Sequence, residues 1–214
     1  MKKNMRMVVA AIACVAVSTG CFSIGKKGAP VQRFLLEAER AAAAREPTFA
    51  KTEEEKSLPM LAIGRFRGTL EASERAIRWV DARNSRTGRL ADGEFAQPAV
   101  EFLKSALQSG LGDLPGYRLV ADAGIISMAR QNTDLLEGWM ERCRLVCDSD
   151  GHWRAEMRVQ FLLYRNGVLE REFRVRSEQS AGLAGVPTAE TAVGLFRDAL
   201  ADILRQVEAQ LSAK

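Results

Sequence analysis

Residues 135–176 read LLEGWMERCRLVCDSDGHWRAEMRVQFLLYRNGVLEREFRVR, and this stretch decides the fold. It contains three strand-like runs, at residues 135–147, 153–164 and 168–176. Turn residues separate the runs: Asp-Ser-Asp-Gly follows the first, and Arg-Asn-Gly follows the second. Asn-Gly is the pair favoured in a two-residue hairpin turn. The stretch therefore predicts an antiparallel meander of three long strands.

The last two runs alternate between apolar residues and charged or polar residues. Because successive side chains of a strand point to opposite faces, one face of this meander is expected to be apolar and the other charged. A sheet of this kind is covered by helices on one side only. The charged face is either a solvated surface or a docking face for a partner. The candidate docking residues are Glu156, Arg158, Glu170, Glu172 and Arg174.

Helical spacing of apolar residues occurs in the sequence both before and after the meander. Apolar residues recur on one face of residues 95–112, and Pro98 is tolerated there because it lies in the first turn. A second helix is expected after Pro187, with Thr188 as its N-cap. The inner face of this terminal helix consists of Phe196, Leu200, Ile203, Val207 and Leu211.

Shorter strand-like runs lie at residues 31–37, 61–66, 76–82 and 118–122. Together with the meander and the two helices, they predict an α+β fold: a largely antiparallel sheet with two main helices packed on one face.

The composition divides the chain into three parts: a signal peptide at residues 1–20, a tether at 21–57 and one α+β domain at 58–214. The tether holds Cys21, the first strand and a polar linker. Residues 38–57 have few large apolar side chains, so they predict a solvated helix or a loop.

The chain begins with a segment typical of export. Basic residues at positions 2, 3 and 6 precede an uncharged run at 7–17, and Ser-Thr-Gly-Cys follows, ending at Cys21. A basic start, a short apolar run and small residues at the cleavage site predict a secretory signal peptide. The apolar run is too short for a transmembrane helix. The alternative to a lipoprotein is an ordinary secreted protein cut near Gly20. Cys14 is a poorer lipid site than Cys21, because it would leave an apolar run of about seven residues.

Thr-Gly-Cys at this place resembles the lipobox of bacterial lipoproteins, although Ser18 stands where the lipobox usually has Leu. The resemblance implies that the Cys21 thiol receives a diacylglycerol, that the chain is cut before Cys21, and that its new amine is acylated, with palmitate among the fatty acids. In many Gram-negative lipoproteins, Asp directly after the lipidated cysteine is the signal for retention in the inner membrane. Residue 22 is Phe, so the resemblance also implies an outer-membrane lipoprotein facing the periplasm.

The charge of the mature chain argues against nucleic-acid binding. The full sequence has 31 Lys and Arg residues against 27 Asp and Glu residues. Loss of the three basic residues of the signal peptide reduces the first number to 28, against the same 27 acids. Binding to a phosphate backbone depends on clustered, uncompensated cations, so a nucleic-acid partner is not expected.

The sequence presents no recognisable catalytic or metal-binding motif. Cys143 and Cys147 would lie about 13 Å apart on one strand, which is too far for a disulfide, so two half-buried thiols are expected. A disulfide and a metal site remain alternatives for this pair. His152 has no obvious partner and is expected at a surface turn. Asp148 and Asp150 start like a calcium loop, but Val159 stands where such a loop needs Glu.

The order of segments behind Cys21 carries a family resemblance. Gln-Arg-Phe-Leu-Leu at residues 32–36 is followed by a strand at 77–82, a polar linker, Phe-Ala-Gln-Pro at 95–98, a hairpin region and a terminal helix rich in Ala and Leu. This order resembles the ABC-type transport auxiliary lipoprotein family, which includes the PqiC-like components of membrane lipid-transport systems.

The family resemblance implies an accessory role beside an ABC transporter permease and ATPase and an MCE-domain protein, in phospholipid trafficking between membranes and in envelope integrity. It implies no enzymatic activity and no cofactor. Two other classes stay open: a lipoprotein scaffold of another envelope assembly or secretion machine, and an envelope enzyme with an irregular site. A homo-oligomer is also left open.

Overall fold

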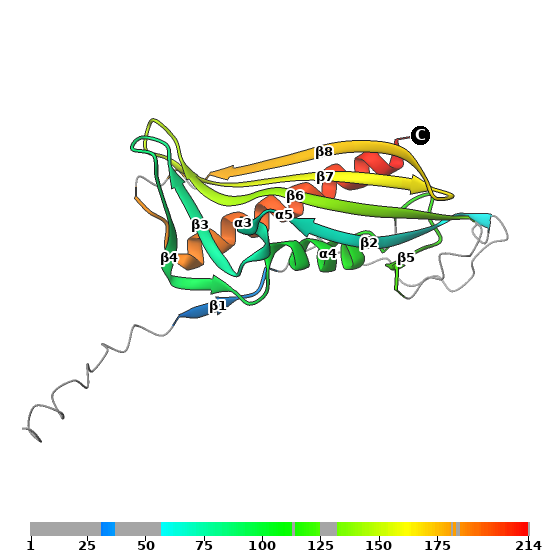
Figure 1. The fold of residues 1–214 in the computed structure, drawn as a ribbon, viewed down its shortest axis with the longest axis horizontal. Helices are drawn as coiled ribbons and strands as arrows, with labels where there is room; N and C mark the ends of the chain where they lie inside the picture. The colour runs from blue at the N-terminus through cyan, green and yellow to red at the C-terminus, as the bar shows by residue number, and fades with distance from the viewer. Residues whose placement is uncertain are drawn as a thin grey trace, which may run out of the picture. The chain divides into compact units, whose positions relative to one another are not determined.

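The meander is present as three long antiparallel strands: β6 (Thr133–Cys147), β7 (Trp153–Arg165) and β8 (Val168–Ser180) (Figure 1). Asn166 and Gly167 both have positive φ, at 52° and 77°. These are the backbone conformations that an Asn-Gly hairpin turn of type I′ requires. The turn between β7 and β8 is therefore the one that the sequence predicts.

The computed structural model describes residues 31–36, 57–112, 114–124, 132–180, 182 and 185–213. The signal peptide, Cys21 and most of the predicted polar linker lie outside these residues. The described elements belong to one unit that runs from Gln32 to Lys214.

The meander continues into an eight-stranded mixed sheet. Its other strands are β1 (Gln32–Phe34), β2 (Met60–Gly68), β3 (Ala76–Asp81), β4 (Arg86–Phe95) and β5 (Leu119–Asp122). The longest ladders are antiparallel, as expected, but β6 also pairs in parallel with both β2 and β3. Parallel pairing was not expected, because it joins segments that are distant in the chain.

Strand β6 carries two neighbours in succession along one edge. Residues 133–140 pair with β2, and residues 145–147 pair with β3. The short helix α3 (Leu70–Ser73) lies between these two ladders, beside a bulge in β6. The amide of Thr69, just before α3, donates a hydrogen bond of 3.0 Å to the carbonyl of Met140. Helix α3 thus occupies the interval along β6 between the end of its pairing with β2 and the start of its pairing with β3.

Strand β4 and the start of the following helix correct the sequence analysis. Residues 86–95 were expected to be a polar linker followed by a helix that begins at Phe95. They form β4 instead, and Phe95 is its last residue, buried in the core. Strand β4 is held by pairing with β3 on one side and β1 on the other. Residues 86–95 have no apolar alternation of their own, so their strand conformation comes from pairing with β1 and β3.

Two long helices, α4 (Ala99–Gly110) and α5 (Ala189–Ser212), contribute to the same hydrophobic core as the sheet. Helix α5 packs against β7 and β8, and α4 packs against β2 and α5 (Figure 1). The predicted inner face of α5 is buried throughout. The Thr188 hydroxyl accepts a hydrogen bond of 3.3 Å from the Thr191 amide, which confirms Thr188 as the N-cap. The α+β fold with two main helices is confirmed.

Among the described residues, no helix is both long enough and apolar enough to cross a membrane.

Candidate functional site

The outer face of the meander, which is the face turned away from α5, is organised in cross-strand rows. One row contains Arg144, Glu156 and Glu178. The neighbouring row contains Arg142, Arg158 and Arg176. A third row contains Trp139, Gln160 and Arg174. These rows bring together most of the predicted docking residues.

Glu156 differs from the expectation, because its residue is only 5% exposed. Its carboxylate accepts a hydrogen bond of 3.1 Å from Arg144 Nε and one of 3.4 Å from Arg158 Nη2. A buried carboxylate is retained only when it is paired in this way. Glu156 therefore holds two strands in register and offers little surface to a partner.

Arg158, Glu172 and Arg174 lie closer to solvent. The side chain of Arg174 is 62% exposed, and its guanidinium lies 3.4 Å from Glu141 and 3.7 Å from Glu172. Glu172 also accepts a hydrogen bond of 2.7 Å from Gln160. A shallow hollow of about 530 Å³ opens here, lined by Glu141, Arg158, Arg174, Val175 and Arg176. We call it the arginine hollow.

Glu170 lies apart from the other predicted docking residues. A bulge between Leu163 and Tyr164 changes the register of β7 and β8 next to it. Glu170 accepts a hydrogen bond of 2.8 Å from Arg165 and lines a second pocket, at the hairpin end of the sheet. The strict alternation that placed Glu170 with Glu172 in the sequence fails at this bulge.

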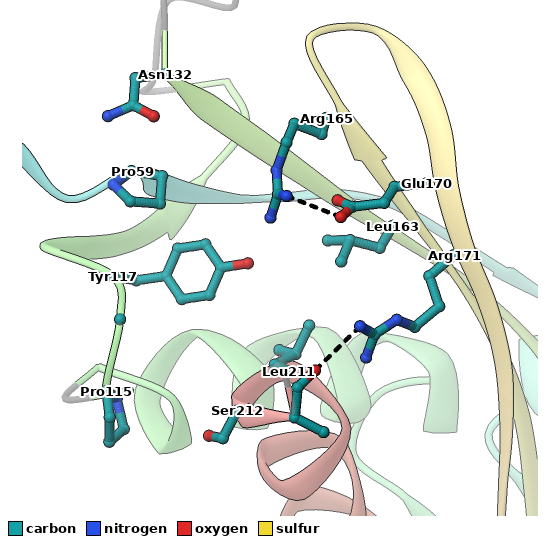
Figure 2. Close-up of a pocket in the computed structure, with 12 residues that line it drawn as sticks. Pro59, Pro115, Tyr117, Asn132, Leu163, Arg165, Glu170, Arg171, Leu211 and Ser212 are labelled. Carbon is teal, nitrogen blue, oxygen red and sulfur yellow. Dashed lines mark hydrogen bonds and ion pairs between the residues drawn. The ribbon is translucent and has the colours of Figure 1, made fainter.

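This end pocket has a volume of about 570 Å³ and was not predicted from the sequence. Figure 2 shows its walls: Pro115 and Tyr117 on one side, Arg165, Glu170 and Arg171 on another, and the last turn of α5 below. These residues come from segments that are far apart in the chain. Periodicity within one segment gives no signal for such a pocket.

The polar groups of the end pocket bind one another. Tyr117 donates a hydrogen bond of 2.9 Å to Asp134, whose carboxylate also accepts two hydrogen bonds from Arg165. Burial, followed by the charge of Asp134, raises the pKa of the Tyr117 hydroxyl. Arg171 donates to the carbonyls of Gln210 and Ala213, at 2.6 and 3.0 Å, and so satisfies the end of α5. These contacts stabilise the fold at this end.

The two cysteines of β6 are free and fully buried. Burial raises the pKa of both the Cys143 and Cys147 thiols. Both side chains contribute to the inner face of the sheet, since residues four apart on a strand share a face. The prediction of two free thiols is confirmed, although they are more deeply buried than expected.

His152 lies exposed in the turn between β6 and β7, where its amide donates a hydrogen bond of 2.9 Å to Asp148. In the described part of the chain, no group of three or more His, Cys, Asp or Glu side chains is arranged to hold a metal ion. Cys21, the predicted lipid site, lies outside this part.

Sequence analysis did not place Arg142, Arg144 or Glu178 on the charged face, and Arg176, although it belongs to the last alternating run, was not among the candidate docking residues. Arg176 lies in a run whose alternation was recognised, so strand parity could have placed it beside Arg158, whereas a bulge after Met140 interrupts the alternation of β6 before Arg142. The end pocket offered no comparable signal.

No protein-family model and no curated protein matches the sequence. Solved structures do share its fold. An uncharacterized protein has 17% sequence identity and a TM-score of 0.56, with 72% of this chain and 92% of the other covered. A DUF330 protein from Xanthomonas campestris has 10% identity and a TM-score of 0.56, with 71% and 85% covered. At these identities the likeness concerns the fold alone, and the chain has the fold of these two proteins.

Proposed function

We propose that this protein is a bacterial lipoprotein, anchored in the outer membrane through Cys21 with its α+β domain in the periplasm. The observation that carries the proposal is the Thr-Gly-Cys sequence directly after a basic start and a short apolar run. Several acyl chains on one cysteine anchor a domain stably, because each buried methylene contributes about 0.8 kcal/mol.

In this proposal the domain is a non-catalytic accessory subunit of an ABC/MCE-type transport system that moves phospholipids between membranes. Two observations support this role. The order of segments resembles the transport auxiliary lipoproteins, and the fold is shared with a DUF330 protein. The domain contributes surfaces that hold partners, and the outer face of the meander is the surface proposed for docking.

Recovery of partners from membranes tests this role. The lipidated protein is crosslinked in cells, solubilised in detergent and purified, and its partners are identified by mass spectrometry. The proposal expects an MCE-domain protein and an ABC permease or ATPase. Recovery of secretion or outer-membrane assembly components in their place would contradict the transport role and favour the scaffold alternative.

The structure guides the choice of substitutions on the docking face. Arg158 supports buried Glu156, so its reversal to Glu would place two acids side by side and disturb the fold. Arg174 and Glu172 are exposed and lie 3.7 Å apart. Exchanging their charges, Glu172→Arg with Arg174→Glu, preserves this pair and reverses the pattern that a partner meets. Glu141→Gln is added to the variant, because Glu141 lies 3.4 Å from Arg174 and would otherwise face a second acid.

The exchanged variant should lose recovery of the transport partners while its melting temperature stays near that of the wild type. The matched control is Asp202→Arg with Arg205→Glu, which exchanges an exposed pair on α5. Normal partner recovery by the first variant would exclude this part of the outer face as the docking surface.

A further inference from the structure

Three arginines stand side by side on the outer face of the meander. Arg142 of β6 pairs in register with Arg158 of β7, which pairs with Arg176 of β8. Direct cross-strand neighbours have Cβ atoms about 4.5 to 5.5 Å apart, and like charges at such positions destabilise a sheet. A row of three arginines is therefore an arrangement that stability alone does not favour.

The acids around this row do not give each arginine a partner of its own. Glu71 lies 4.0 Å from Arg142 and 3.7 Å from Arg144, so these two arginines share it. Glu156 is shared between Arg144 and Arg158.

Glu178 lies against both Arg154 and Arg176, and Arg154 also has Asp148 at 3.7 Å. Each of these three glutamates is thus divided between two guanidinium groups. Arg158 contacts its shared acid through Nη2 at 3.4 Å, so its guanidinium keeps donors for a further anion.

The arginine hollow gives that anion a place. Its lining combines Arg158 and Arg176 from the row with Arg174 from the next row, against one acid, Glu141. Arginine presents a planar fork of donors that fits the oxygens of a phosphate group in pairs. Of the two common anionic groups, a phosphate suits the three guanidinium groups better than a carboxylate does, because a phosphate offers more acceptor oxygens.

We propose that the arginine hollow binds a phosphate group, such as the one in a phospholipid headgroup. The choice of headgroup as its source rests on the proposed role in lipid transport, whereas the phosphate chemistry rests on the arginines alone. Glu141 and Glu172 hold Arg174 at the edge of the hollow, and the arginine row supplies the other donors.

Trp139 provides a probe for this site. It lies in the row of Gln160 and Arg174 and is 43% exposed, so its fluorescence responds to a change at the hollow. The lipidated full-length protein, held in neutral detergent micelles, is titrated with inorganic phosphate and with glycerophosphoglycerol at constant ionic strength. A Trp139→Phe variant identifies the part of the signal that comes from this residue, since the chain has two other tryptophans.

The wild type should bind, and Arg158→Gln with Arg176→Gln should weaken binding about tenfold or more, because two charge-assisted contacts are lost. Arg176→Lys, which keeps the charge without the fork, should lose less. The control Arg33→Gln with Arg205→Gln removes two exposed arginines elsewhere and should bind like the wild type. Circular dichroism confirms that each variant is folded.

Tighter binding of glycerophosphoglycerol than of inorganic phosphate would identify a headgroup as the source, and equal binding would identify a general phosphate site. Absence of binding to both probes, or equal weakening in the control variant, would overturn the proposal. This result is independent of partner recovery, because it is measured on the purified protein.

Discussion

Arg165 donates two hydrogen bonds to Asp134, from Nε to Oδ1 and from Nη2 to Oδ2, both 3.2 Å long. The two residues are register partners on β7 and β6, and Asp134 is only 1% exposed. Tyr117 adds a third donor to the same carboxylate. This one acid therefore joins the loop before β5 to the hairpin end of the sheet.

Replacing Asp134 with alanine should lower the free energy of unfolding on the order of 3 kcal/mol, because Tyr117 and Arg165 would lose a buried partner. Asp134→Asn should cost less, since the amide oxygen still accepts one hydrogen bond. Urea denaturation measures both changes. The control is Glu137→Gln, on the other face of β6, which should stay within about 0.5 kcal/mol of the wild type. An equally small effect for Asp134→Ala would contradict a structural role for this contact.

Stability at alkaline pH should depend on Tyr117. Burial raises the pKa of its hydroxyl in the folded protein, so the unfolded chain releases this proton at a lower pH. The stabilisation is complete below the ordinary tyrosine pKa of about 10 and declines as the pH rises above it.

Tyr117→Phe removes this titration, so its unfolding midpoint should fall less than that of the wild type between about pH 9 and pH 11. Urea midpoints across this range provide the measurement, and comparing the two proteins cancels the contribution of other groups. Parallel curves for the two proteins would show that Tyr117 does not titrate with a raised pKa.

Cys143 and Cys147 should be unreactive in the native protein. Burial raises the pKa of each thiol, and the thiolate is the reactive form. In the mature lipoprotein at about pH 8, a thiol reagent should label neither cysteine without denaturant and both in guanidinium. Mass spectrometry counts the labels. Rapid native labelling, or two thiols missing after denaturation, would contradict two buried free cysteines.

Helix α5 should contribute strongly to stability through its buried face. Leu200 is fully buried, so Leu200→Ala should lower the free energy of unfolding by about 2 to 5 kcal/mol. Gln210→Ala, at an exposed position of the same helix, serves as the control. A chain that ends before Thr188 and still melts like the intact protein would show that α5 is not part of the core.

The sequence was sufficient where one local pattern decides the structure. Alternation over β7 and β8 identified the meander, and the spacing of apolar residues identified α5 with its cap at Thr188. It failed for β4, whose residues 86–95 lack alternation and become a strand only by pairing with β1 and β3. Parallel pairing of β6 with β2 has no local signature either.

The predicted docking face shows the same limit at single residues. Alternation placed Glu156 and Glu170 on the charged face together with Arg158. Ion pairing buries Glu156, and a bulge next to Glu170 directs it to Arg165 in the end pocket. Both outcomes depend on neighbouring strands, so strand parity alone could not predict them.

Mass spectrometry of the mature N-terminus tests the central claim most directly. The account predicts that the protein purified from membranes begins at Cys21, with a diacylglycerol on the thiol and a fatty acid on the amine. It also predicts that a Cys21→Ala chain keeps its folded domain, carries no labelled palmitate and stays uncut at this site. A mature chain that begins at another residue without lipid, or a Cys21→Ala chain processed and labelled like the wild type, would contradict the account.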